Sequence, residues 1–312
     1  MSKKIATRDA YGEALVEIGR KDSRVVVLDA DLSKSTKTAK FGEVFPARFF
    51  NMGIAEADMM GTAAGLAASG LIPFASTFAV FAAGRVFDQV RNSIAYPSLN
   101  VKIVATHAGI TVGEDGASHQ AVEDIALMRA LPNMTVIVPA DAWETKKAVE
   151  AAVNHKGPVY IRLGRSGVPV LFTEQDTFTL GKGTVLREGS DTAIIAAGIM
   201  VSTALEAAGN LSAKGIQARV INMSTLKPLD TEIIVQAARD TGRIITAEEH
   251  SIIGGLGSAA AEVLAENYPV YLKRIGIKDS FGESGSPDLL MQKYGLMAED
   301  IERAALELIK KG

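Results

Sequence analysis

The chain has 312 residues, 47% of them hydrophobic and 22% charged, and this length is enough for two globular domains with a core each. Its 33 basic and 36 acidic residues nearly balance, and no stripe of Lys or Arg stands out, which argues against a nucleic-acid partner. The absence of Cys excludes disulfides, zinc–thiolate sites and a cysteine nucleophile, and it favours a cytoplasmic protein.

Two features bear on membranes. No apolar segment follows the basic residues near the start of the chain, so we expect no signal peptide. The stretch from Gly61 to Gly84 carries no charge and is long enough to span a bilayer. It consists mainly of small residues and contains Pro73, so we interpret it as a buried helix, strand and helix, and we expect no membrane partner.

Short apolar runs alternate with helical patterns along the first half of the chain. The runs predict strands at 24–29, 71–76, 101–106, 134–138 and 159–162. The helical patterns lie at 55–68, 82–95, 121–130 and 143–154. Strands separated by helices of this length form βαβ units around a parallel sheet with right-handed crossovers.

The pattern loosens between 167 and about 190, where Gly, Pro and polar residues predict a linker with a short hairpin. Alternation then resumes, with strands expected at 192–197, 218–223, 243–247 and 270–277 and helices at 201–214, 230–240, 258–267 and 298–310. We therefore predict an α/β protein of two doubly wound domains: a parallel-sheet domain over 1–168, a linker over 169–188, and a smaller α/β domain over 189–312.

The loop from Thr106 to His119 follows a predicted strand, at the end of a parallel sheet where open α/β folds bind ligands. It holds His107 and His119, two of only four His in the chain, with Asp115 between them. Such side chains can move protons or bind phosphate and sugar hydroxyls. The same residues also fit a capped surface loop, and composition alone does not separate the two interpretations.

Three other features are candidates for a site. Glu56 opens a helix of small apolar residues, so it is either a first-turn carboxylate stabilised by the helix dipole or a buried functional group. Phe78 and Phe81 are three residues apart and would share a face on helical backbone, as core or as a wall against a flat ring. The turn at 254–258 resembles a phosphate-binding loop but lacks the dinucleotide fingerprint, so close backbone packing is favoured.

Four segments at these positions resemble the C-terminal half of transketolase, a thiamine-diphosphate-dependent family. They are Ile54–Ala57, Val112–Gln120, Arg129–Asn133 and Phe281–Gly285, and the similarity runs over nearly the whole chain. The run Gly-Glu-Asp-Gly-x-x-His followed by Arg-Ala-Leu-Pro-Asn is specific to this branch. The Ile-Ala-Glu element alone is shared with deoxyxylulose-phosphate synthase and the β subunits of 2-oxoacid dehydrogenases.

The resemblance implies a split enzyme. The family binds the diphosphate and a metal ion, Mg²⁺ or Ca²⁺, through a Gly-Asp-Gly…Asn element, which we do not find in this chain. We therefore expect an N-terminal transketolase subunit to hold the diphosphate and the metal ion, with none bound by this chain. The simplest assembly is α2β2, and the apolar stretch Gly61–Gly84 would partly serve that interface.

The resemblance also assigns roles to residues. Glu56 matches the glutamate that hydrogen-bonds N1′ of the aminopyrimidine and stabilises its imino tautomer, which takes the proton from C2 of the thiazolium. Phe78 and Phe81 match the aromatic positions around the pyrimidine, with Phe81 the choice for direct stacking. His119 would meet the hydroxyls and oxyanion near the reacting carbons, and Asp115 a sugar hydroxyl. The positions that hold the sugar phosphate are matched by Arg8, Ser35, His107 and Arg165.

The expected reaction moves a two-carbon ketol unit from a ketose phosphate to an aldose phosphate. One alternative keeps the cofactor but resembles deoxyxylulose-phosphate synthase or a 2-oxoacid dehydrogenase β subunit, and another is ketol transfer on an unusual pentose phosphate. A third is a non-catalytic regulatory paralogue, against which Glu56 argues because a structural subunit needs no carboxylate in that apolar helix. His107 favours a phosphorylated sugar, because the oxoacid dehydrogenase branch lacks it.

Overall fold

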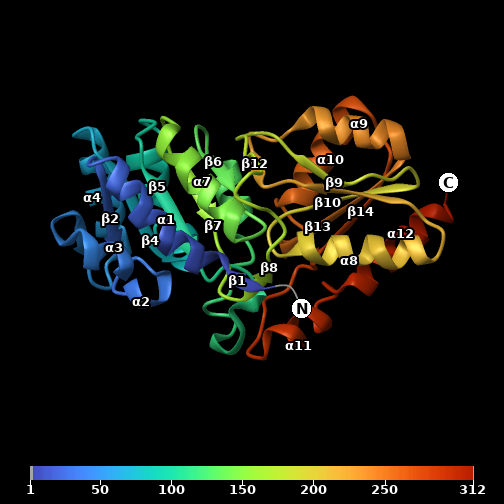
Figure 1. Ribbon diagram of the computed structural model, residues 1–312, viewed down its shortest axis with the longest axis horizontal. Coiled ribbons are helices and arrows are strands. Elements are labelled where there is room, and N and C mark those ends of the chain that lie inside the picture. Colours follow the sequence, from blue (N-terminus) through green and yellow to red (C-terminus); the bar gives the residue numbers. More distant parts are fainter. Residues whose placement is uncertain (1–2, 312) are drawn as a thin grey trace.

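The computed structural model describes residues 3–311 and contains two α/β units, each built around its own sheet (Figure 1). The predicted α/β fold with two helix-covered sheets is confirmed. Met1, Ser2 and Gly312, which belong to the ends of the predicted domains, lie outside the described residues.

The first sheet has seven strands in the order β12-β6-β7-β5-β4-β2-β3. Neighbouring strands run parallel, except that β12 pairs antiparallel with β6. The strands in this order are Thr225–Lys227, Thr135–Ile137, Val159–Arg162, Lys102–Thr106, Ile72–Phe78, Val25–Asp29 and Phe49–Asn51. The central strands are buried on both faces, which explains their continuous apolar sequence.

Alternate residues of each strand enter two different core layers. In β2, Val25 and Val27 pack with residues of α1 (Thr7–Lys21) and α7 (Ala142–Asn154). Val26 and Leu28 enter the opposite layer, with α4 (Glu56–Ala68) and α6 (Asp124–Ala130). Both faces of this sheet are therefore covered, as a doubly wound domain requires.

The second sheet has five strands in the order β14-β13-β10-β11-β9, parallel except for the antiparallel edge strand β9. These strands are Tyr271–Ile277, Arg243–Ser251, Thr192–Ala196, Ala218–Asn222 and Thr184–Arg187. Figure 1 shows α8 (Met200–Ala213) and α12 (Ala298–Ile309) on one face, and α9 (Thr231–Thr241) and α10 (Leu256–Asn267) on the other.

Several elements join the two units. Strand β1 (Lys4–Ala6) pairs with β8 (Gly167–Pro169) near their junction, and β12 adds a segment from the second half of the chain to the first sheet. One apolar cluster also continues from Tyr160 through Met223 and Leu226 into the second unit. The predicted linker hairpin is wrong, because its last residues form β9 and pair with β11.

Some elements differ from the prediction. The helix expected at 82–95 is three short helical pieces: a π-helical turn Phe81–Arg85, α5 (Phe87–Gln89) and a second π-helical turn Val90–Ala95. Several short elements and the long helix α1 were not expected from the sequence. They are α1, α2 (Ser33–Thr36), α3 (Ala39–Val44), the 3₁₀ turns Pro46–Arg48 and Ile110–Asp115, β1, β3, β12 and α11 (Pro287–Lys293). Among residues 3–311, no helix combines the length and apolar character needed to cross a membrane.

Candidate functional site

The predicted site residues gather where three neighbouring parallel strands end. Asp29 at the end of β2 pairs in register with Ser76 of β4, and Phe78 at the end of β4 pairs with Thr106 of β5. The loops that follow these strands therefore emerge at one edge of the sheet, where open α/β folds bind ligands. This position follows directly from the strand order.

Aromatic rings form the centre of the site. The His107 imidazole stacks on Phe78 with a centroid distance of 3.8 Å, and the Phe78 and Phe81 rings lie 6.1 Å apart and nearly parallel. His119 meets the Phe81 ring edge-on at 5.5 Å. The expectation that the two Phe share a helical face is wrong, because Phe78 is the last residue of a strand. Their rings nevertheless lie together, and both histidines join them.

His107 is held neutral by its surroundings. Its Nε2 lies 2.9 Å from Arg8 Nη1, which can only donate, so Nε2 accepts and Nδ1 carries the proton toward Thr106 Oγ1 at 2.8 Å. Burial and the neighbouring cations, Arg8 and Arg165 first among them, lower the pKa of His107 to about 3. The positive charge near this imidazole therefore comes from the arginines.

Arg8 and Arg165 flank His107 and form with it a cluster that we call the anion site. Arg8 also donates to the backbone carbonyl of Ser35 at 3.1 Å, so the structure brings Ser35 here through its carbonyl oxygen. Arg165 donates to the Val112 carbonyl at 2.5 Å, and its Nη1 lies 3.6 Å from Asp115 Oδ1. Arg8, Ser35, His107, Asp115 and Arg165 thus belong to one neighbourhood.

The loop that presents Ser35 is fixed by a buried carboxylate. Asp29 accepts hydrogen bonds from the Leu32 amide at 2.6 Å and from the hydroxyls of Thr36 at 2.6 Å and Thr38 at 2.8 Å. Burial raises the pKa of this carboxyl, and its hydrogen bonds oppose that rise. Asp29 therefore anchors the loop, and the Ser35 carbonyl oxygen accepts the hydrogen bond from Arg8.

Glu56 is the first residue of α4, where the helix dipole favours a carboxylate, and it is also buried, with only 3% of its surface exposed. Arg85 Nη1 lies 2.9 Å from each of its two carboxylate oxygens. The Arg85 guanidinium carbon also lies 4.1 Å from the centre of the Phe81 ring. Arg85 was not expected at the site, because the sequence shows only that a basic residue follows the two Phe. We call Glu56 and Phe81 the ring site.

Contacts across the junction of the two units hold the His107–His119 loop in place. Glu249 at the end of β13 accepts from the Thr111 amide at 2.7 Å, and a Cβ on Gly109 would lie 2.2 Å from its carboxyl carbon. Arg162 donates to Asp124 and to the backbone carbonyls of Ala121 and Glu249. We call Asp124, Arg162 and Glu249 the interdomain joint.

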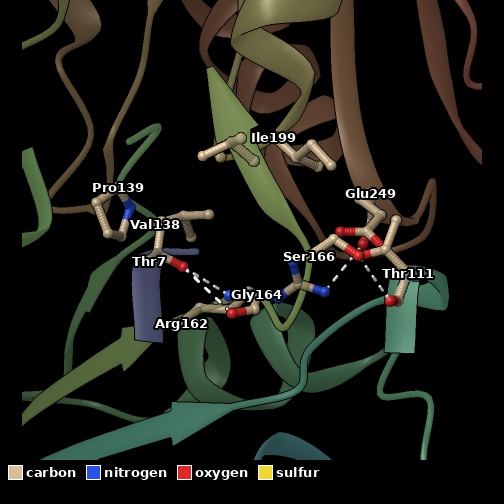
Figure 2. Close-up of a pocket in the computed structure, with 11 residues that line it drawn as sticks. Thr7, Thr111, Val138, Pro139, Arg162, Gly164, Ser166, Ile199 and Glu249 are labelled. Carbon is tan, nitrogen blue, oxygen red and sulfur yellow. Dashed lines mark hydrogen bonds between the residues drawn. The ribbon is translucent and has the colours of Figure 1, made fainter. Parts of the chain in front are cut away.

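The cavity drawn in Figure 2 lies inside this joint and has a volume of about 20 Å³. Thr7 and Gly164 on its wall precede Arg8 and Arg165, and Thr111 lies opposite, bonded to Glu249 (Figure 2). A space of that size fits about one water molecule, so it is too small for a cofactor. The cavity is therefore part of the packing around the interdomain joint, and it is not the candidate binding site.

In the glycine turn at 254–258, a carboxylate of the same chain already accepts hydrogen bonds from two backbone amides. Glu248 accepts from the backbone amides of Leu256 at 2.7 Å and Gly257 at 2.8 Å, at the start of α10. A Cβ on Gly254 would lie 2.6 Å from the Cβ of Ala126, so the turn packs too closely against α6 for a side chain there. Close backbone packing is confirmed as the role of these glycines. Among residues 3–311, no group of three or more His, Asp or Glu side chains is placed to hold a metal ion.

The fold and this arrangement agree with sequence comparisons. The family described as "Transketolase, pyrimidine binding domain" matches residues 3–170, and "Transketolase, C-terminal domain" matches residues 181–301. The chain belongs to the transketolase family.

Its relatives narrow this placement. The chain is 53% identical to a "Putative transketolase C-terminal section" of Methanocaldococcus jannaschii, covering 97% of this chain and 96% of that protein. It is 49% identical to the "6-deoxy-6-sulfo-D-fructose transketolase subunit SqwH" of a Clostridium species, covering 97% and 94%. A solved structure titled "Split gene transketolase, inactive beta4 tetramer" is 61% identical, with a TM-score of 0.93 and coverage of 98% and 99%. The chain therefore matches C-terminal transketolase subunits over nearly their full length.

Proposed function

We propose that this chain is the C-terminal subunit of a thiamine-diphosphate-dependent transketolase. Together with an N-terminal subunit, it would transfer a two-carbon ketol unit from a ketose phosphate to an aldose phosphate. The observation that carries the proposal is the juxtaposition of the buried Glu56 carboxylate and the Phe81 ring with a cluster of two arginines and two histidines. One part suits a flat heterocycle, and the other suits an anionic sugar.

The ring site fits the aminopyrimidine of thiamine diphosphate. It already accommodates a planar nitrogen-bearing group, because the Arg85 guanidinium contacts the Phe81 ring and donates to Glu56. Glu56 and Phe81 would hold the pyrimidine, with Phe78 behind Phe81. When bound, the cofactor supplies the carbon nucleophile that cleaves and forms the carbon–carbon bond. We propose that the partner subunit holds its diphosphate and the Mg²⁺ or Ca²⁺ ion.

Glu56 would control a proton at the ring site. Its carboxyl group is nearly excluded from solvent, so a hydrogen bond between it and a ring nitrogen is not weakened by competing water. A buried carboxylate also needs a partner at all times, since leaving it alone is costly. Glu56 therefore suits the control of ring protonation better than an exposed glutamate would.

The anion site would bind the substrate's charged end. Arg8 is fixed by His107 Nε2 and the Ser35 carbonyl, and Arg165 by the Val112 carbonyl. Guanidinium groups held in this way are preorganised donors for a tetrahedral oxyanion. His119 at the edge of Phe81 and Asp115 beside Arg165 would contact the substrate between the anion site and the ring site. Neutral His107 would accept from Arg8 and orient it.

Similarity to subunits of split transketolases supports the need for a partner. One such relative is described as inactive when it forms a β4 tetramer, which supports the expectation that this chain is inactive alone. Another is described as acting on a sulfonated sugar, and a sulfonate is also a tetrahedral oxyanion. We propose an α2β2 assembly that uses phosphorylated sugars.

Affinity purification of this chain from its native cells, followed by a ketol-transfer assay, tests the proposal. We expect a co-purifying protein that carries the Gly-Asp-Gly…Asn element, and transfer activity that requires both proteins, thiamine diphosphate and Mg²⁺. Phosphorylated ketoses, unphosphorylated ketoses and 6-deoxy-6-sulfofructose should be compared as donors. A chain that purifies alone, or a complex that transfers no two-carbon unit, would contradict the proposal.

A further inference from the structure

Arg85 occupies the ring site in a way that matches the proposed ligand. Its Nη1 lies 2.9 Å from both oxygens of Glu56, and its guanidinium carbon lies 4.1 Å from the centre of the Phe81 ring. A guanidinium is a flat N–C–N unit that donates hydrogen bonds within its plane and stacks on aromatic rings. The imino tautomer of an aminopyrimidine is also flat and carries an N–H donor in the plane of its ring, at N1′. The two groups therefore suit the same carboxylate and the same aromatic ring.

We propose that Arg85 is a placeholder, which fills the ring site in the unloaded chain and leaves it when the cofactor's aminopyrimidine binds. This inference rests on the proposed function. Both oxygens of Glu56 face the same Arg85 nitrogen, so a ring that bonds to Glu56 has to displace that contact. Arg85 thereby sets the affinity for the cofactor, because each binding event has to break the resident ion pair.

The surroundings of Arg85 allow this exchange. Its side chain is 48% exposed, whereas the Glu56 side chain is 3% exposed. The guanidinium can therefore move into water at low cost, while the carboxylate cannot. The placeholder thus keeps a buried carboxylate paired until a ring replaces it.

A different role for Arg85 predicts the opposite result. If the guanidinium stayed on Glu56 in the loaded enzyme and held the carboxylate for the ring, its removal would weaken cofactor binding. A placeholder, in contrast, competes with the ring, so its removal strengthens binding. The sign of the change in cofactor affinity therefore separates the two roles without any measurement of activity.

The test is a calorimetric titration of the assembled complex with thiamine diphosphate in the presence of Mg²⁺. Arg85→Met retains an unbranched apolar side chain and removes the competing cation. We expect it to lower the dissociation constant on the order of fivefold to tenfold, as loss of a modest half-exposed ion pair permits. Arg91→Met is the matched control, because Arg91 is exposed on the second π-helical turn, Val90–Ala95, and its side chain bonds only to Asn92 among the described residues. The control should bind like wild type.

Three outcomes are distinguishable. Tighter binding by Arg85→Met alone supports the placeholder, and equal or weaker binding overturns it while the proposed function stands. Absence of cofactor binding by the wild-type complex overturns the proposed function and the placeholder with it.

A second measurement uses the chain without its partner. Melting temperatures of Arg85→Met, Glu56→Gln and the double variant should be non-additive, because the two side chains are paired. Additive shifts would show that the pair does not form in solution, and they would overturn the placeholder even if the affinity of the complex changed.

Discussion

The ring site and the anion site are neighbours, but the Arg–carboxylate pairs beside them differ in how deeply they are buried. In the ring site the Arg85–Glu56 pair has a half-exposed cation, and nothing besides Glu56 accepts a hydrogen bond from that guanidinium among residues 3–311. The interdomain joint near the anion site contains the Arg162–Asp124 pair, whose side chains are 6% and 0% exposed, and which also bonds to Tyr160 and two backbone carbonyls. The same two chemical groups thus form an exchangeable contact in one place and a fixed support in the other.

This difference matches what each part has to bind. The cofactor ring has to enter the ring site, so it is an advantage that Arg85 can leave Glu56 easily. A small charged substrate gains more from donors that are already oriented, because less conformational freedom is lost on binding. Exposure of the cation decides between the two behaviours.

The largest expected effect is on the free energy of unfolding, when Arg162 and Arg85 are replaced in turn. Arg162→Met should lower the free energy of unfolding by about 3–5 kcal/mol, since it leaves the carboxylate of Asp124 buried without its cation. Arg85→Met should lower it less, by about 1–3 kcal/mol, because Glu56 loses its cation as well but water can reach the carboxylate through the half-exposed place of the removed guanidinium. Urea unfolding of the free chain followed by circular dichroism measures both. Equal losses of unfolding free energy would contradict the distinction between a fixed Arg162–Asp124 pair and an exchangeable Arg85–Glu56 pair.

Substrate charge gives the next test. His107→Ala removes the acceptor that orients Arg8, so it should raise KM for phosphorylated donors roughly tenfold, as expected for loss of a hydrogen bond to a charged group. KM for unphosphorylated donors should change little. Arg85→Met should leave the ratio of the two KM values unchanged. Steady-state kinetics of the assembled complex measures this ratio, and equal increases for both donor classes would remove His107 from the anion site.

Support from the second unit can be tested through Glu249. Glu249→Ala removes the acceptor for the Thr111 amide and should lower kcat by roughly threefold to tenfold, because the loop with His107 and His119 loses one anchor. Glu249→Gln keeps a carbonyl oxygen and should recover most of the rate. Calorimetry should find thiamine diphosphate affinity unchanged in both variants. A parallel loss of cofactor affinity would show that the interdomain joint supports the ring site as well.

The expected effect that is smallest at neutral pH is a pH dependence of stability. Burial and the nearby arginines lower the pKa of His107 to about 3 from 6.5, so between these values the unfolded chain binds a proton that the folded chain does not. This contribution is complete above pH 6.5 and is lost as the pH falls toward 3. His107→Asn should flatten the fall in unfolding free energy by up to about 1.4 kcal/mol per pH unit in that window. Urea titrations at several pH values measure it, and an unchanged slope would show that His107 is not buried as a neutral group.

The sequence predicted most of the first sheet because its buried strands are continuous apolar runs between helices. It did not predict α1, although Ala10, Tyr11, Ala14, Leu15 and Ile18 repeat at helical spacing and basic residues close the last turn. The strand β12 was not predictable from three residues, since its partner β6 is far away in the chain. Short edge strands depend on tertiary contacts more than on local pattern.

The site was predicted through its separate motifs, and only the fold explains how they meet. The resemblance assigned roles to Glu56 and to His107, whose juxtaposition follows from the order of the strands. Arg85 had no such signal, because the π-helical turn that aims it at Glu56 has no clear sequence pattern. Glu249 was missed because its contact with Thr111 joins residues 138 positions apart. The roles of the individual site residues remain predictions.

The proposed ketol transfer depends most on the carboxylate of Glu56. The measurement that tests it most directly is the rate of ketol transfer by the assembled complex with Glu56→Gln, which keeps the shape of the side chain and removes its acidity. We expect the rate to fall at least about a hundredfold, as for the loss of an acid–base group. A variant complex that transfers the ketol unit at the wild-type rate would contradict the account.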